Sequence, residues 1–501
     1  MKRTIYTTIA LVLMSAMSSA QNLDDFEAYK AQQLAEFEQY REDENAEFEA
    51  FRKKQNEEFA EFMRKQWSDF RTFNAVPVPQ RPEPPKPVVK SAETKPMDEP
   101  QQLVVNTPPA ITTKAVKETA DRKRASKKSN RRSKKATSTP YLDFDFYGTP
   151  CSIPVDGSYR FTLEEVSNNG IADVWQLLST EKYFDIAERL IELRGKLNLC
   201  DWGYVCLTDI FARSLMGNNR INEARVLQMF ILTQSGYKMR IAQNDGRILL
   251  LMPFAGDINI YAYPYITKEG HKYYILDKEC GGQLQISVFD REFPNENLCS
   301  LEMDGEPALK STPAGSRKYR SKKYEDLNAT VAINRNIIDF YNSYPVTDAW
   351  DMYVRTSLSN ATREQFYPQL LAAIESKSKT EAADILLNFV QTAFEYKTDR
   401  EQFGRERPLF AEETLYYPFC DCEDRSILYA ILVRELLELD VVLLNYPTHL
   451  ATAVDFGKDI PGKYINYKGK HYFVCDPTYI GASIGEAMPN LDSQEITIVE
   501  I

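Results

Sequence analysis

The sequence predicts an α+β protein that is built from several parts. The first observation is an aromatic repeat with a period of eleven residues over residues 21–73. The second is a stretch over residues 74–140 that is rich in proline and then in basic residues. The third is the change from helical to strand-like periodicity that occurs in the remaining chain. At 501 residues and 43% hydrophobic residues, the chain has material for two or three packed domains.

Residues 1–20 have the features of a secretory signal peptide. Lys2 and Arg3 precede an apolar run centred on residues 9–14, and residues 18–20 offer a cleavage site of small residues. The apolar run is too short to cross a bilayer. We therefore expect an exported protein that resides in the periplasm, in the cell envelope or outside the cell.

Composition limits the partners and cofactors. A formal net charge of −11 argues against nucleic-acid binding. Eight cysteines permit disulfides in an exported chain, but their spacing fits no metal site. We therefore expect no metal, no organic cofactor and no nucleic-acid partner.

Residues 21–73 predict one long amphipathic helix. Two aromatic series recur every eleven residues, three positions apart from each other. Eleven residues are almost three helical turns, so both series fall on one stripe. We expect self-association through residues 22–73, with a single extended helix as the alternative. The two series are Phe26, Phe37, Phe48, Phe59 and Phe70, and Tyr29, Tyr40, Phe51, Phe62 and Phe73.

Residues 74–140 predict a disordered linker without a core. Proline is frequent from Pro77 to Pro109, which favours an extended spacer. Residues 114–135 then carry eleven Lys or Arg against Glu118 and Asp121, and self-repulsion keeps such a block unfolded. The basic block suits an anionic envelope surface; a solvated linker is the plainer interpretation.

Residues 141–320 predict an accessory domain in which helices come first and strands follow. Asn244-Asp245-Gly246 between two strand-like runs is a strong hairpin signal. We find no catalytic set of residues here. The expected helices are 172–178, 184–197, 201–215 and 221–234, and the expected strands are 237–243, 247–252, 258–265, 272–276, 283–289 and, just beyond this domain, 328–333.

Residues 321–501 contain the candidate nucleophile. Helices over 363–374 and 380–394 are expected to pack beside a third helix that starts at Cys422. The free N–H groups and the macrodipole at a helix start favour a thiolate, so Cys422 is a candidate nucleophile near neutral pH. Cys420, two residues upstream, is the alternative, either as a redox partner or as a bystander.

A cysteine nucleophile needs a base and a residue that orients the base. The chain has three histidines, of which His449 lies between two strand-like runs. Asp476 ends a further strand-like run. The order of cysteine on a helix, histidine at one strand and aspartate at the next predicts a triad. We interpret His271 as solvated and His471 as structural or surface-exposed.

Three sequence pieces together resemble the transglutaminase-like (papain-related) superfamily: Asp421-Cys422-Glu423-Asp424-x-Ser426, His449 at a strand start, and Asp476-Pro477-Thr478. The resemblance covers roughly residues 380–501. It implies a papain-like fold and thiol acyl transfer on a peptide or protein substrate, with Cys422, His449 and Asp476 as the catalytic residues. It also implies a side-chain donor that completes an oxyanion hole with the backbone N–H of Cys422, for which Tyr416 and Tyr417 are our candidates.

Other functions stay open at this point. Hydrolysis of a peptide or related amide is the first expectation, since water is the default acyl acceptor, and transamidation that cross-links proteins is the alternative. A non-catalytic scaffold or binding protein of the envelope is a second alternative. A redox or metal site at Cys420-x-Cys422 is disfavoured, because the spacing is not C-x-x-C and no nearby Cys or His set completes a tetrahedral site.

Overall fold

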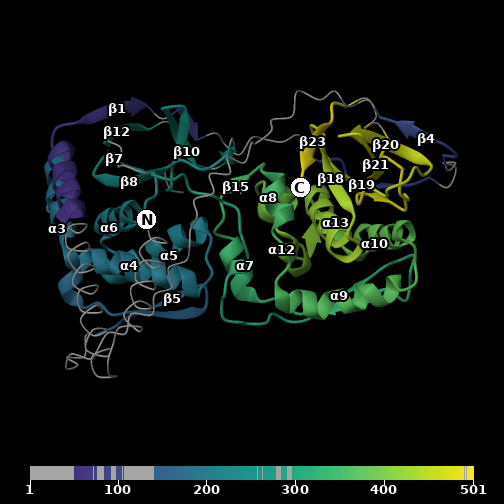
Figure 1. Ribbon diagram of the computed structural model, residues 1–501, viewed down its shortest axis with the longest axis horizontal. Helices are drawn as coiled ribbons and strands as arrows, with labels where there is room; N and C mark the ends of the chain where they lie inside the picture. Colours follow the sequence, from purple (N-terminus) through teal and green to yellow (C-terminus); the bar gives the residue numbers. More distant parts are fainter. Residues whose placement is uncertain are drawn as a thin grey trace, which may run out of the picture.

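The computed structural model describes residues 50–71, 73–75, 84–91, 97–103, 105, 140–256, 258–261, 263–277, 284–289, 296–489, 491 and 494–501. These residues form two lobes side by side, one coloured purple to teal and the other green to yellow (Figure 1). Both lobes combine helices with a sheet, so the α+β prediction is confirmed. The predicted signal peptide, residues 21–49 of the repeat and the basic block 114–135 lie outside the described residues.

None of the helices in the described part of the chain combines the length and the apolar character that crossing a bilayer requires.

The first lobe packs helices against an antiparallel sheet. Asp245 and Gly246 have φ angles of 44° and 76°, the left-handed values that a two-residue hairpin turn needs. The helices are α3 (Asn168–Leu178), α4 (Glu181–Lys196), α5 (Asp201–Met216) and α6 (Ile221–Gln234). The described strands lie in the spatial order β1 (Trp67–Arg71), β12 (Gln285–Phe289), β7 (Arg240–Asn244), β8 (Arg247–Met252), β11 (His271–Ile275), β10 (Pro264–Lys268) and β2 (Phe73–Ala75).

The end of the aromatic repeat folds against this lobe. Residues 50–63 are helical, and the ring centroid of Phe59 lies 5.0 Å from that of Trp175 and 4.6 Å from that of Phe289. Phe62, of the second aromatic series, is 38% exposed. The prediction of a helix over 21–73 is wrong beyond residue 63, because β1 and β2 pair there with β12 and β10. The partner of Phe59 is the same chain, and self-association of the remaining repeat stays a prediction.

The second lobe surrounds a central helix, α13 (Cys422–Leu437), whose residues 422–433 are all buried. Such all-round burial marks a core helix, where the sequence predicted one wide buried face. The other helices are α7 (Arg335–Tyr341), α8 (Trp350–Arg355), α9 (Asn360–Ile374), α10 (Lys379–Ala393), α11 (Asp399–Phe403) and α12 (Ala411–Tyr416). The described strands of its sheet lie in the order β23 (Thr497–Glu500), β18 (Asp440–Asn445), β19 (Leu450–Asp455), β21 (Lys470–Cys475), β20 (Gly462–Tyr467) and β4 (Pro100–Gln102).

Short strand pairs complete the fold. In the hairpin of β13 (Arg317–Arg320) and β14 (Asn328–Val331), Tyr319 packs against Phe366 and Phe394 of the second lobe. The predicted domain boundary at 320 therefore falls inside this hairpin. The other pairs are β5 (Leu142–Phe146) with β6 (Thr149–Ile153), β9 (Ile260–Tyr261) with β15 (Val346–Thr347), β16 (Glu395–Tyr396) with β17 (Phe419–Cys420), and β3 (Val88–Val89) with β22 (Tyr479–Ile480). A short 3₁₀ helix spans Gly157–Tyr159.

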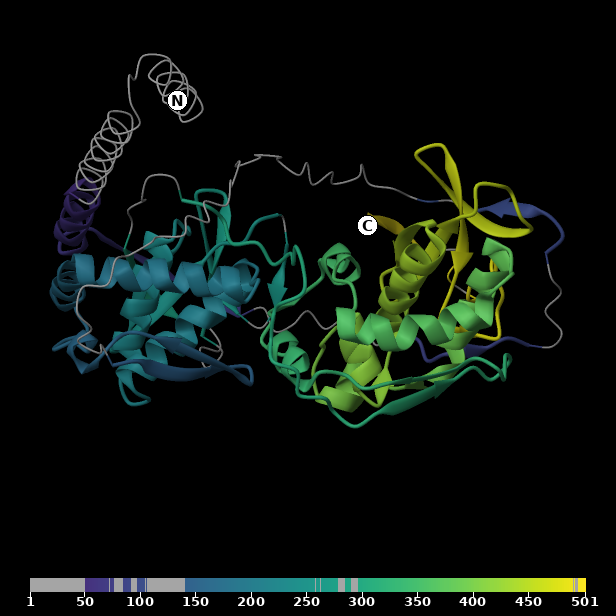
Figure 2. The same cartoon turned by 60° about the horizontal axis from the view of Figure 1, so that its bottom comes forward.

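Two stretches of the proline-rich region pack on the second lobe, where Figure 2 shows them in blue. β3 pairs in parallel with β22, and β4 extends the sheet beside β20. Leu103 is 6% exposed and belongs to a hydrophobic cluster of this lobe. The prediction of a linker without a core over 74–140 is wrong for these stretches, because their backbone groups and apolar side chains find partners on the lobe.

Candidate active site

Two of the three predicted catalytic residues form a direct hydrogen bond. His449 precedes β19, and Asp476 follows β21, which pairs with β19 so that Thr452 lies opposite Cys475. This register brings the two residues to one end of the sheet. Nε2 of His449 lies 3.0 Å from Oδ2 of Asp476, and both side chains are fully buried. The structure therefore brings His449 and Asp476 together as the sequence predicts.

Cys422 occupies the first turn of α13, as the sequence predicts. The backbone N–H of Leu450, the residue after His449, acts to lower the pKa of Cys422, as the smallest of several influences on it. Ser426, one turn further along, donates to the carbonyl of Leu450 at 2.7 Å and fastens α13 to β19. Within the described residues, Nδ1 of His449 is buried and has no hydrogen-bond partner. Since Nε2 is taken by Asp476, Nδ1 is the ring nitrogen left over, and within the described residues it is not hydrogen-bonded to the thiol of Cys422.

The thiol of Cys422 is held in its protonated form. Its sulfur donates to Oε2 of Glu423 at 2.9 Å. Burial, followed by the charges of Glu423 and Asp421, raises the pKa of Cys422 well above its usual value. The sequence prediction that the helix start favours a thiolate is therefore wrong in its net effect, because burial and two carboxylates outweigh the macrodipole. A base must take the proton before the sulfur can attack.

Buried carboxyl groups surround the start of α13. Asp424 accepts from the backbone N–H of Asp421 at 3.2 Å and from that of Leu409 at 2.8 Å. Asp421 in turn accepts from the backbone N–H of Asp399 at 3.3 Å. Burial, with the neighbouring carboxylates as a second cause, raises the pKa of Asp399, Asp421 and Asp424 well above its usual value. These groups therefore favour the neutral form.

Two of these carboxyl groups, together with that of Glu423, are the candidates for holding a cation. Oxygens of Asp399, Asp421 and Glu423 lie within 4.8 Å of one another. Within the described residues, Oδ1 of Asp421 has no hydrogen-bond partner. The other contacts are internal, since Asp399 accepts from the backbone N–H of Arg407 at 2.6 Å and Glu423 accepts from the thiol of Cys422. We interpret this cluster as the structural cap of α13 and derive no chemical step through a metal.

Cys420, the alternative nucleophile, has different surroundings. It lies in β17, which pairs in parallel with β16, and its thiol points to the carbonyl of Glu395 at 3.9 Å. Burial raises the pKa of Cys420 to about 11. The thiol of Cys420 therefore faces β16. The residue of a strand that influences the thiol of Cys422 is instead Leu450 of β19.

The contacts given for the tyrosines predicted for the oxyanion hole are with residues other than Cys422. The hydroxyl of Tyr417 donates to Oδ1 of Asn342 at 3.1 Å, and the carbonyl of Tyr416 accepts from Arg317. Tyr396, which sequence reasoning missed, interacts electrostatically with the thiol of Cys422. Burial and then the charge of Cys422 raise the pKa of Tyr396 far above its usual value. Its two-residue strand leaves no periodicity in the sequence by which to find it.

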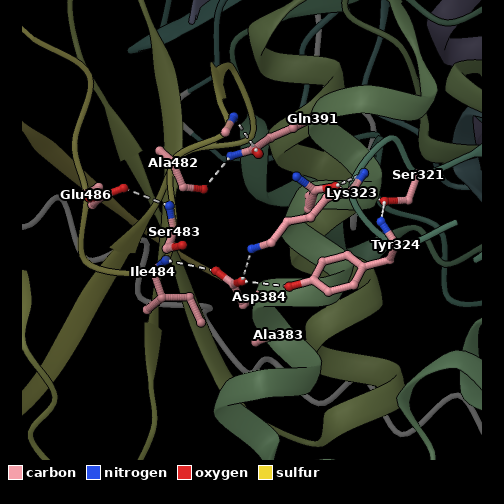
Figure 3. A network of polar contacts seen from close by, with 12 residues as sticks. Ser321, Lys323, Tyr324, Ala383, Asp384, Gln391, Ala482, Ser483, Ile484 and Glu486 are labelled. Carbon is pink, nitrogen blue, oxygen red and sulfur yellow. Dashed lines mark hydrogen bonds and ion pairs between the residues drawn. The ribbon is translucent and has the colours of Figure 1, made fainter. Parts of the chain in front are cut away.

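The turn after Asp476 is fixed to α10 by Gln391. The Gln391 side-chain amide donates to the carbonyls of Asp476 at 3.1 Å, Tyr479 at 2.8 Å and Ala482 at 3.0 Å. Its Oε1 accepts from the backbone N–H of Gly481 at 3.1 Å. Figure 3 shows this side chain aimed from α10 at the turn. The residues that follow Asp476 therefore form a rigid platform.

Two cavities of the described part of the chain are lined by other residues. One of about 620 Å³ lies between α9, α10 and the end of α13, and one of about 340 Å³ lies in the first lobe around Trp202, Cys206 and Arg225. Cys422 is 1% exposed and His449 is 3% exposed. The candidate site is therefore closed in this conformation.

Comparison of the chain with protein-family models, with curated proteins and with solved structures finds no significant match. The functional interpretation therefore depends on the residues and geometry given above.

Proposed function

We propose that the chain is an exported thiol acyl-transfer enzyme, with a transglutaminase-like (papain-related) second lobe, that hydrolyses peptide or related amide bonds. The observation that carries the proposal is the buried 3.0 Å hydrogen bond between His449 and Asp476. It leaves Nδ1 of His449 without a hydrogen-bond partner among the described residues. Leu450, the next residue along the chain, influences the pKa of Cys422. Export is proposed from the signal-like sequence of residues 1–20.

In the proposed reaction, Asp476 fixes the imidazole with the proton on Nε2, so that Nδ1 is a base. Nδ1 takes the proton of Cys422, and the sulfur attacks the amide carbonyl. The C–N bond breaks, and the amine leaves with the proton from His449, which gives a thioester on Cys422. Water then attacks the thioester with His449 as base, which releases the acid and restores the thiol.

Charge on the reacting oxygen also needs donors. The backbone N–H of Cys422 lies in the first turn of α13 and is free of helical hydrogen bonding. We propose the hydroxyl of Tyr396 as the side-chain donor, because Tyr396 interacts electrostatically with Cys422 and its hydroxyl already donates to a peptide carbonyl, that of Pro85, at 3.2 Å. The earlier prediction of Tyr416 or Tyr417 in this role stays untested.

A non-catalytic envelope protein is the second candidate. The closed site favours it, since the thiol is buried, bonded to Glu423 and protonated. Transamidation remains an alternative outcome of the same chemistry, in which an amine replaces water as the acceptor of the acyl group.

The test is turnover of a peptide library by the full-length chain, with the acyl-enzyme trapped by acid and its mass measured. We expect acylation and hydrolysis to disappear in Cys422→Ala and to persist in the matched variant Cys420→Ala. Addition of a primary amine separates hydrolysis from transamidation by the product formed. Acylation that persists in Cys422→Ala and disappears in Cys420→Ala would overturn the assignment, and a folded protein that is never acylated would favour the non-catalytic role.

A further inference from the structure

A segment of the chain's own proline-rich region lies beside the candidate site. Val88 pairs with Tyr479 and Val89 with Ile480, in parallel. The backbone N–H of Lys90 donates to the carbonyl of Ile480 at 2.9 Å. β22 begins three residues after Asp476, so residues 84–91 add a strand directly next to the turn that follows the catalytic acid.

One end of this segment is anchored by an ion pair. Nζ of Lys90 lies 2.6 and 2.8 Å from the two carboxylate oxygens of Glu486, and these side chains are only 21% and 14% exposed. Glu486 is oriented in advance, because it also accepts from the backbone N–H of Ser483 at 2.9 Å (Figure 3). Asp384 of α10 accepts from the neighbouring N–H of Ile484 at 3.3 Å. Glu486, which accepts the ion pair from Lys90, therefore belongs to the rigid platform that follows Asp476.

The other end of the segment reaches Tyr396. The hydroxyl of Tyr396 donates to the carbonyl of Pro85 at 3.2 Å. A peptide carbonyl of the chain itself thus occupies the donor that we propose for the substrate's oxyanion. Pro84, Pro85 and Pro87 fix extended backbone and lack N–H groups, which suits a strand at an open edge.

We propose that Tyr396, β22 and Glu486 form the peptide-binding groove of the enzyme, and that residues 84–91 occupy it as an internal ligand. The inferred substrate is an extended, proline-containing peptide that runs parallel to β22 and places a basic side chain five residues after the carbonyl held by Tyr396, as Lys90 follows Pro85. That this peptide is a substrate rests on the proposed function, whereas its binding to the groove requires no turnover. A peptide enters only when the internal segment leaves, which agrees with the closed site.

Binding is measured with the full-length chain carrying Cys422→Ala, so that no turnover consumes the probe. The probe is a fluorescein-labelled peptide with the sequence of residues 82–92, and the readout is anisotropy. Lys90→Glu opposes Glu486 and frees the groove, whereas Lys86→Glu makes the same charge change at an exposed side chain of the same segment. We expect Lys90→Glu to bind the probe roughly tenfold or more tightly than the unaltered chain or Lys86→Glu, which is the scale expected for loss of a largely buried charge pair.

A second variant shows whether Glu486 is the contact and whether the protein remains folded. Glu486→Lys also releases the internal segment, and we expect it to prefer a probe with Glu in place of the residue at position 90. Equal binding by Lys90→Glu and Lys86→Glu, or a preference of Glu486→Lys for the original probe, would overturn the groove. Probe binding without any turnover by the active chain would contradict the proposed function alone, and turnover without probe binding would contradict the groove alone.

Discussion

Cys206 in the first lobe and Cys422 in the second are both buried thiols, and they differ in their neighbours. Burial raises the pKa of Cys206 to about 12, and its sulfur lies 3.6 Å from the hydroxyl of Ser343. Cys422 lies against the strand that follows His449 and beside the carboxylate of Glu423. Both thiols are protonated at neutral pH, so burial and a raised pKa do not mark a nucleophile. We propose that the imidazole of His449, which is hydrogen-bonded to the buried Asp476, is what sets Cys422 apart.

Removing the carboxylate of Asp476 should make Cys422 as unreactive as Cys206. In Asp476→Ala the imidazole loses the hydrogen bond that fixes its tautomer, and we expect kcat/KM to fall by about 10²–10⁴-fold. Asp476→Asn keeps the shape of the side chain and should lose less than Asp476→Ala. Steady-state kinetics on an active peptide measures both variants. Equal activity of Asp476→Ala and the unaltered chain would show that the two thiols differ for another reason.

The rigid platform behind Asp476 is a second difference between the two surroundings. Gln391 serves three carbonyls and one N–H of the turn, and it is buried. We expect Gln391→Ala to lower the free energy of unfolding by about 2–4 kcal/mol, because it leaves buried carbonyls without donors. Gln369→Ala, which removes a partly exposed glutamine of α9 that bonds Thr330, should cost less than about 1 kcal/mol. Urea unfolding measures both, and equal losses would contradict the role of Gln391.

The carboxyl groups near Cys422 should make stability depend on pH. Burial raises the pKa of Asp421, so the folded state favours its protonated form. The stability from this group is present below the unfolded pKa of about 3.9 and is lost as the pH rises through the higher folded pKa. We expect Asp421→Asn to raise the Tm at pH 8 by about 2–4 °C and to flatten the fall in Tm above about pH 4. Calorimetry tests this, and a lower Tm at pH 8 would contradict it.

Removing the charge of Glu423, which lies beside Cys422, is expected to have the smallest effect of these changes. Glu423→Gln keeps a hydrogen-bonding side chain but removes the negative charge that, after burial, contributes most to the raised pKa of Cys422. We expect the pH midpoint for alkylation of Cys422 to move to lower pH, while that of Cys206 stays unchanged. A midpoint that moves to higher pH would show that the carboxylate acts as a base for the thiol.

Local patterns predicted the elements that their own sequence determines. The predicted helices at 172–178, 184–197, 201–215 and 221–234 correspond to α3, α4, α5 and α6, and Asn244-Asp245-Gly246 forms the predicted hairpin turn. The positions of Cys422, His449 and Asp476 at a helix start and at strand ends followed from apolar runs flanked by polar residues. Each of these signals lies within one stretch of chain.

Contacts between distant residues were missed. Val88 and Val89 are β-branched residues beside Pro87, an edge-strand signal that the surrounding prolines concealed. The last aromatic repeat became strand because β12 and β10 offered backbone partners that its helical period does not reveal. The direction of the pKa shift of Cys422 depended on how deeply α13 is buried and where the Glu423 carboxylate points, neither of which the sequence states.

The central claim is that His449 activates Cys422, and the rate of alkylation at each cysteine tests it most directly. Iodoacetamide labelling of the full-length chain, followed by peptide mass spectrometry, gives separate rates for Cys422, Cys420 and Cys206 as a function of pH. The account predicts that Cys422 reacts faster than the other two near neutral pH and that His449→Ala removes this advantage. A rate at Cys422 that does not change in His449→Ala, or that is no faster than at Cys206, would contradict it.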